Sequence, residues 1–130
     1  MTAFVRFQAT TSNARGHHPG VFALVNGLAA DGRLSAEDER WRQAANADMT
    51  ARYVDPSTVD PGVYDRQLHP GASAWFRAKA DELIERVRAY CDLLDRHGIG
   101  WERVDRADPG RIVYADAVQV VVVPHEPGDS

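Results

Sequence analysis

Apolar and polar residues alternate in short runs near both ends of the chain and follow helical spacing between them. Residues 3–9 are rich in β-forming residues, which predicts a strand with Val5 and Phe7 on one face. Residues 99–123 contain three strand-like runs separated by turns, which predicts a C-terminal β-meander. The last of these runs, residues 118–123, is apolar on both faces, which is typical of a strand buried on both sides.

Two helical patterns make up residues 19–53 and meet at a polar Asp31-Gly32 turn. The first pattern, residues 19–30, is apolar on nearly every side, which is typical of a buried helix. The second begins at Ser35, whose hydroxyl is expected to cap the helix by accepting a hydrogen bond from the first turn. Apolar residues four apart then predict a buried stripe along this helix, formed by Trp41, Ala45, Met49 and Tyr53.

A proline-containing segment, residues 54–70, separates the helical pair from the longest helical pattern. Its three prolines disfavour helix for the residues that precede them, so this segment predicts an extended crossing loop. Residues 72–97 carry a continuous apolar face, which predicts one long helix ended by Gly98. The last residues, 124–130, are polar and are expected to fray.

These elements predict an α+β fold in a single domain, residues 1–130. We expect a small, mostly antiparallel sheet, built from the N-terminal strand and the C-terminal β-meander, packed against the helical pair and the long helix. The apolar final strand leaves two alternatives. Either the helices cover both faces of the sheet, or one face is a homodimer surface where Val121 and Val123 contact the partner.

Composition narrows the classes of partner and the compartment. A net charge of −4 and a pI near 5.7 argue against nucleic acid and against an anionic membrane surface, which select clustered basic residues. The single cysteine, Cys91, excludes a disulfide within the chain and a zinc site built from several cysteines. Because no apolar run has the length of a signal-peptide core or a membrane span, we expect a cytoplasmic protein.

No motif in the sequence indicates a metal ion or a cofactor. The five histidines are scattered, without the H-x-x-x-H or H-x-H spacing of a metal site. The Asp31-Gly32 turn resembles the second half of an EF-hand loop, but the positions of two carboxylate ligands are occupied by Gly27 and Ala29. Phosphate-binding loops, dinucleotide fingerprints and nucleophile elbows do not occur. We therefore expect no metal and no cofactor.

One set of polar residues remains as a candidate ligand site. Arg42 and Asn46 are four residues apart, so they share one face of the second helix. Together with residues that flank the crossing loop and the first loop, they would bind a polar or anionic small molecule. The alternative is that Arg42 and Asn46 cap neighbouring loops and pair with the loop aspartates. The further members of the candidate set are Tyr53, Asp55, His17, His18 and His69.

The absence of a catalytic motif favours a cytoplasmic, non-catalytic binding or accessory protein that acts through a protein partner or by self-association. The alternative is a small enzyme or a small-molecule-binding protein. It would use a His/Arg/Asn/Tyr pocket between the second helix and the crossing loop.

Several segments of the chain, RGHHPGVFALVNGL, DGRLS and PGRIVYAD among them, resemble a family of small hypothetical proteins from actinomycetes. The resemblance covers nearly the full chain. That family has no assigned activity, so the resemblance implies a single cytoplasmic domain and identifies no site residues.

Overall fold

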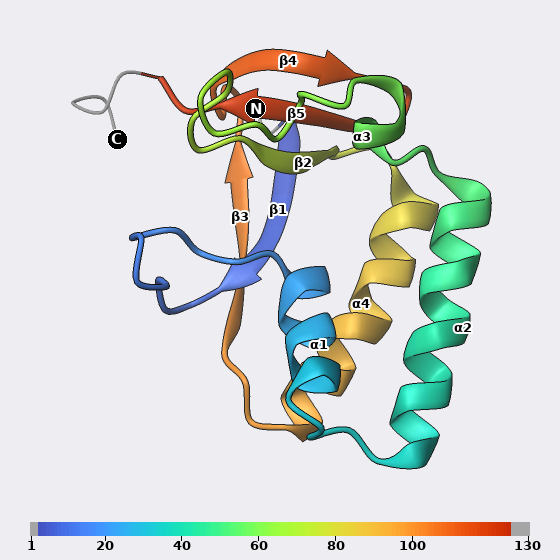
Figure 1. The fold of residues 1–130 in the computed structure, drawn as a ribbon. Coiled ribbons are helices and arrows are strands. Elements are labelled where there is room, and N and C mark those ends of the chain that lie inside the picture. The colour runs from blue at the N-terminus through green and yellow to red at the C-terminus, as the bar shows by residue number, and fades with distance from the viewer. Residues whose placement is uncertain (1–2, 126–130) are drawn as a thin grey trace. The chain divides into compact units, whose positions relative to one another are not determined.

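The computed structural model describes residues 3–125, which form four helices and five strands (Figure 1). The predicted α+β class is confirmed. Five residues of the tail that was expected to fray, 126–130, lie outside the described part of the chain. In chain order the elements are β1 (Phe4–Ala9), α1 (Val21–Ala30), α2 (Ala36–Arg52), α3 (Pro56–Val59), β2 (Ser73–Arg77), α4 (Asp81–Arg96), β3 (Trp101–Arg106), β4 (Arg111–Ala115) and β5 (Gln119–Val123).

The chain folds into two compact units, each of which gathers segments that are distant in sequence. Of the described residues, the first, which we call the sheet unit, contains residues 3–6, 55–85 and 103–125. The second, the helical unit, contains residues 7–54 and 86–102. Because β1, α4 and β3 each contribute residues to both units, neither unit is a contiguous domain.

The sheet unit is built on a five-stranded antiparallel sheet with the strand order β3-β1-β2-β5-β4. β5 pairs with β2 on one side and with β4 on the other, and all five of its residues are buried. The prediction of a strand buried on both faces is therefore confirmed. Val121 is 0% exposed and Val123 is 7% exposed, so the chain itself covers the two side chains predicted to contact a partner.

One strand of the predicted β-meander lies elsewhere in the sheet. β4 and β5 form a hairpin as expected, but β3 pairs with β1, where the Ala3 N–H donates to the Arg106 carbonyl at 3.3 Å. β3 and β4 therefore form the two opposite edges of the sheet, although only residues 107–110 join them.

This short connection requires a strongly curled sheet. Four spacings of ~4.8 Å would separate the edges of a flat sheet by ~19 Å, which is beyond the ~18 Å reach of five extended links. The curl lets Val104 of β3 pack against the core formed by Trp75 and Val120 of two inner strands.

The helix predicted over residues 72–97 is in fact a strand followed by a shorter helix. Residues 73–77 form β2, which pairs with two strands: Ala74 lies opposite Val121, and Phe76 lies opposite Val5. Pairing on both sides and burial of the aromatic side chains favour the strand over the helical spacing that links this segment to α4. α4 ends at Arg96, and Gly98 follows the helix end as predicted, with a φ of 68°.

The helical pair follows the sequence expectation with a later start. The Pro19 carbonyl accepts a hydrogen bond from the Ala9 N–H at 2.8 Å, so α1 begins two residues after this proline. The Ser35 hydroxyl accepts from the Asp38 N–H at 3.0 Å and caps α2 as predicted. The crossing loop contains one short helix, α3, which begins after Asp55. None of the helices in the described residues is long and apolar enough to cross a membrane.

Candidate functional site

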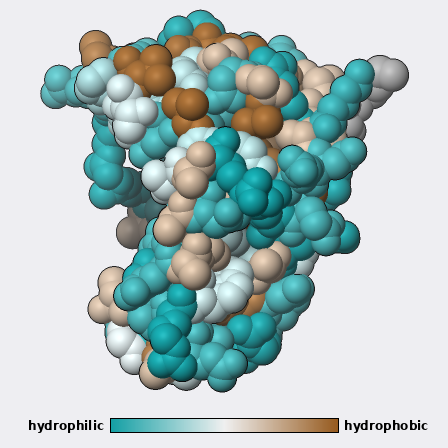
Figure 2. All heavy atoms as spheres, turned by 90° about the vertical axis from the view of Figure 1, so that its right-hand side faces the viewer, coloured by the Kyte–Doolittle hydropathy of each residue, from teal (hydrophilic) through white to brown (hydrophobic). Residues whose placement is uncertain are grey.

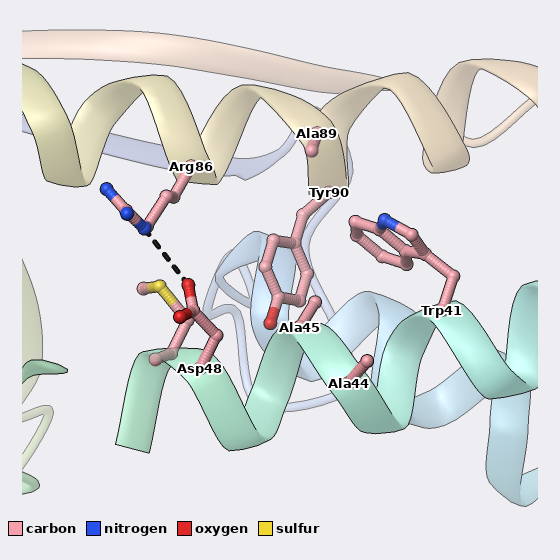
Figure 3. Close-up of a pocket in the computed structure, with 8 residues that line it drawn as sticks. Trp41, Ala44, Ala45, Asp48, Arg86, Ala89 and Tyr90 are labelled. Atoms are coloured by element: carbon pink, nitrogen blue, oxygen red, sulfur yellow. Dashed lines mark hydrogen bonds and ion pairs between the residues drawn. The ribbon is translucent and has the colours of Figure 1, made fainter. Parts of the chain in front are cut away.

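A pocket of about 300 Å³ lies between α2 and α4 in the helical unit (Figure 3). Its lining combines two aromatic rings, a thioether, three methyl groups and one ion pair. The residues that line it are Trp41, Ala44, Ala45, Asp48 and Met49 from α2, and Arg86, Ala89 and Tyr90 from α4.

Small side chains on the facing helices explain why this space exists. The facing positions include Ala44 and Ala45 on α2 and Ala89 on α4, whose methyl groups do not fill the space between the helices (Figure 3). None of the residues of α2 is fully buried. The predicted stripe of α2 is therefore only half-buried, and three of its four members line the pocket instead of closing it.

Tyr90 of α4 forms a wall of the pocket and is held by contacts on several sides. Its side chain is 1% exposed and its ring meets Trp41 edge to face, with 5.1 Å between the ring centroids. On another side it meets Phe22 of α1 at 4.7 Å in the same manner. The Tyr90 hydroxyl donates to Asn46 Oδ1 at 2.6 Å. Burial raises the pKa of Tyr90 to about 12, so this hydroxyl remains a protonated donor at neutral pH.

An ion pair closes the end of the pocket away from Trp41 (Figure 3). Asp48 Oδ2 accepts from Arg86 Nε at 3.0 Å, and Asp48 Oδ1 accepts from Arg52 Nε at 2.8 Å. The hydrogen bonds from Arg52 and Arg86 lower the pKa of Asp48 below its ordinary value. This end of the pocket therefore offers an ionised carboxylate held in place by two guanidinium groups.

A hydrogen-bonded chain behind the pocket contains two of the predicted ligand residues. Asn26 Oδ1 of α1 accepts from Arg42 Nη1 and from Asn46 Nδ2, both at 3.1 Å. Arg42 also pairs with Glu39, and hydrogen bonds from Arg42 and Gln43 lower the pKa of Glu39 to about 2. Arg42 and Asn46 thus lie together, as their spacing predicted, and they join α2 to α1.

The other predicted ligand residues of the helical unit have hydrogen-bond partners close to them in sequence. His18 Nδ1 lies 2.9 Å from the Ala9 carbonyl oxygen, and the backbone N–H of His17 donates to the side-chain Oδ1 of Asn13 at 3.1 Å. Tyr53 ends α2, with its N–H bonded to a carbonyl of the last turn.

The two remaining predicted residues belong to the sheet unit. Asp55 caps α3 by accepting from the Ser57 N–H at 2.9 Å. His69 Nδ1 lies within 3.1 Å of the carbonyl oxygens of Gly62 and Val63, which places a proton on that nitrogen. None of the predicted ligand residues is among those that line the α2–α4 pocket.

We did not predict from the sequence that Ala44, Asp48, Arg86 or Ala89 would line a site. A signal for them was present, because the expected stripe of α2 contains a small residue at Ala45 and is flanked by another at Ala44. A helix with such a narrow apolar stripe leaves space against its neighbour unless that neighbour supplies large side chains. The pairing of Asp48 with Arg86, 38 residues away, had no local signal.

The titratable groups near the pocket do not form a metal site or an activated nucleophile. Within residues 3–125 no group of three or more histidine, cysteine, aspartate or glutamate side chains is arranged to hold a metal ion. Cys91 is buried, and burial raises the pKa of its thiol to about 12. The thiol therefore remains protonated and unreactive at neutral pH.

No protein-family model, curated protein or solved structure matches this chain. The resemblance to a family of small actinomycete proteins therefore stays a prediction.

Proposed function

We propose that the protein is a non-catalytic binding protein whose α2–α4 pocket holds a small aromatic group. The lining of the pocket carries this proposal, because aromatic, thioether and methyl groups surround one charged end. The volume of about 300 Å³ lies at the lower limit of small-molecule sites, which suits one substituted or fused ring.

The chemistry of the two ends specifies the ligand further. A flat ring can pack against Trp41 and the thioether of Met49, both of which interact favourably with aromatic groups. At the other end, the ionised Asp48 carboxylate accepts hydrogen bonds. The ligand is therefore a ring that bears an N–H or O–H donor, such as an indole or a phenol. Tryptophan and tyrosine side chains carry the same groups, so a protein partner that inserts one of them would use the pocket in the same way.

The hydrogen bonds around the pocket support binding over catalysis. Arg42, Asn46 and Tyr90 are bonded to one another or to Asn26, and no described, buried side-chain nitrogen or oxygen lacks a partner. Two arginines lower the pKa of Asp48, which makes this carboxylate a poor general base. We also propose a cytoplasmic location, which is supported by the single cysteine, Cys91, since the chain has no pair of cysteines that could form a disulfide.

Titration of the isotope-labelled protein with indole, followed by amide chemical shifts, tests the proposed site. We expect the shifts to concentrate on the α2 and α4 residues that line the pocket. Ala44→Leu fills part of the pocket and should weaken indole binding by about tenfold, the equivalent of ~1.4 kcal/mol. Ala47→Leu is the matched control, because Ala47 lies on the same helix, is exposed and does not line the pocket. Equal affinity of the two variants would contradict the proposal.

A second titration tests the role of Asp48. 1-Methylindole has the same ring as indole but no N–H, so it should bind the wild-type protein several-fold more weakly. In Asp48→Asn the carboxylate charge is lost, and the preference for indole over 1-methylindole should shrink. An unchanged preference would show that the ring N–H does not meet Asp48.

A further inference from the structure

The two edge strands of the sheet carry different side chains. β3 carries Arg103, Asp105 and Arg106, and Arg103 Nε donates to Asp105 at 3.1 Å. Charges along an edge oppose pairing with a further strand. β4 has no charged residue after Arg111, and its Ile112 is 49% exposed. The β4 edge is therefore charged only at its two ends, whereas β3 carries charges along its length.

The outer side of β4 has unpaired backbone groups. β4 is the last strand in the sheet order and pairs only with β5, so alternate N–H and C=O groups point away from the sheet. In Figure 1 β4 lies on the outer side of β5, at one edge of the sheet. Within the described residues, the backbone hydrogen bonds outside the regular elements include none to Arg111–Ala115. This edge is open to another strand.

We propose that β4 pairs with β4 of a second copy of this chain, antiparallel about a two-fold axis, and so joins two sheets into one. An axis at Val113 places Arg111 opposite the partner's Ala115 and Ile112 opposite the partner's Tyr114 along the backbone. The bulge puts the Ile112 side chain on the face of Val122 and the Tyr114 side chain on the face of Val121, so each copy presents an apolar or aromatic side chain on both faces of the paired edge. A two-fold pairing uses the same strand in both copies and repeats each of these contacts.

The opposite charges at the two ends of β4 favour pairing with a second copy of the same strand, and they favour the antiparallel direction. Arg111 begins the strand and makes no ion pair with the described residues. Asp116 follows the strand, where the N–H groups of Val118 and Gln119 hold its carboxylate at 2.9 Å each. Antiparallel pairing brings Arg111 to the end of the partner's strand, beside the partner's Asp116. Parallel pairing would instead bring the two arginines together.

A β-bulge sets the expected strength of this contact. The register between β4 and β5 shifts between Ile112 and Tyr114, which bends the strand at Val113. Pairing is limited to the five residues of β4, so we expect a dimer that dissociates on dilution.

Sedimentation of the full chain over a wide concentration series tests the dimer. The average mass of the wild type should rise from that of a monomer to that of a dimer. Ile112→Lys puts two like charges into the paired edge and should weaken the dimer by about tenfold or more. The control is Leu68→Lys, because Leu68 is 63% exposed elsewhere in the sheet unit and should not affect dimerisation.

The Leu68→Lys control also tests whether other exposed apolar residues of the sheet unit cause association. Figure 2 shows hydrophobic side chains gathered at the surface of the sheet unit, and this unit exposes Val59 and Leu68 as well as Ile112. If Leu68→Lys weakens the dimer as much as Ile112→Lys, association runs through a general apolar surface and the β4 proposal fails. A protein that stays monomeric at every concentration also overturns it.

Oxidative cross-linking tests the register without disrupting the edge. In the proposed pairing Val113 faces the partner's Val113 at the axis, within the range of Cα separations that a disulfide spans. Val113→Cys should therefore form a covalent dimer on mild oxidation, and Val59→Cys should not. The native Cys91 is buried and does not compete. Equal cross-linking of the two variants, or none in Val113→Cys, contradicts the register.

Discussion

Asn46 connects three helices through one side chain amide. Asn46 lies on α2. Its Oδ1 accepts a hydrogen bond from the Tyr90 hydroxyl of α4 at 2.6 Å, and its Nδ2 donates to Asn26 Oδ1 of α1 at 3.1 Å. The Tyr90 side chain is buried, so its hydroxyl has no access to water in place of this partner. At the scale of single residues, the wall of the pocket therefore depends on this hydrogen bond.

Tyr90→Phe should lower the free energy of unfolding by ~1–2 kcal/mol, because the partly buried Asn46 carbonyl loses its donor. Urea denaturation followed by circular dichroism measures the change. Tyr53→Phe is the matched control, since the Tyr53 hydroxyl makes no hydrogen bond with the described residues, and it should be close to neutral. Equal effects of the two variants would show that the hydroxyl of Tyr90 does not stabilise the fold.

Glu39 should make stability depend on pH in the acid range. Hydrogen bonds from Arg42 and Gln43 lower the pKa of Glu39 to about 2 in the folded protein. Because folding lowers this pKa, the interaction is complete above the unfolded value of ~4.3 and is lost as the pH falls towards about 2.

Melting temperatures across this range provide the test. The wild type should exceed Glu39→Gln at neutral pH, and the difference should disappear in acid. Asp92→Asn on α4 serves as the control, because Asp92 is exposed and has no hydrogen-bond partner among residues 3–125. A difference that persists unchanged into acid would contradict the assignment.

The sequence predicted the positions of single residues better than their partners. The four-residue spacing placed Arg42 and Asn46 on one helix face, and the structure has them there. Their partners are Asn26, on another helix, and Tyr90, 44 residues away from Asn46. The spacing of residues along one helix does not tell which side chains of other helices will contact that helix. The hydrogen bonds that link Asn26, Asn46 and Tyr90 were therefore not predictable from the sequence.

At the scale of elements, local signals fixed the caps and turns, and tertiary pairing decided the rest. Ser35 and Gly98 mark helix ends as predicted, because capping and positive φ depend on neighbouring residues alone. The sequence predicted that residues 73–77 begin a helix. They form a strand instead, because they pair with β1 on one side and with β5 on the other. Long-range pairing also explains why β3 lies beside β1 and not beside β4, as the predicted meander required.

The turn before β4 provides a test at this scale. Gly110 has a φ of 154°, and a Cβ added there would overlap the carbonyl oxygen of Val123. Gly110→Ala should therefore destabilise the fold by about 3 kcal/mol or more. Gly32→Ala also changes a glycine of positive φ, but nothing lies within 4 Å of the added Cβ. It should cost only ~1–2 kcal/mol, and equal losses would contradict the close approach at Gly110.

At the scale of the whole molecule, each unit of the chain has its own candidate surface. The helical unit holds the α2–α4 pocket, and the sheet unit carries the open β4 edge. The pattern of apolar and polar residues along the chain predicted an α+β fold, but it did not predict either surface. A pocket depends on the space that alanines leave between two helices, and an open edge depends on strand order. Both follow from contacts between distant segments.

The central claim is that the α2–α4 pocket holds a donor-bearing aromatic ring, and a crystal structure of the protein with indole tests it most directly. We predict electron density for the ring between Trp41 and Met49, with its N–H directed at the Asp48 carboxylate. Ala44→Leu crystals treated in the same way should lack this density. Indole bound elsewhere, or density unchanged in Ala44→Leu, would contradict the proposed site.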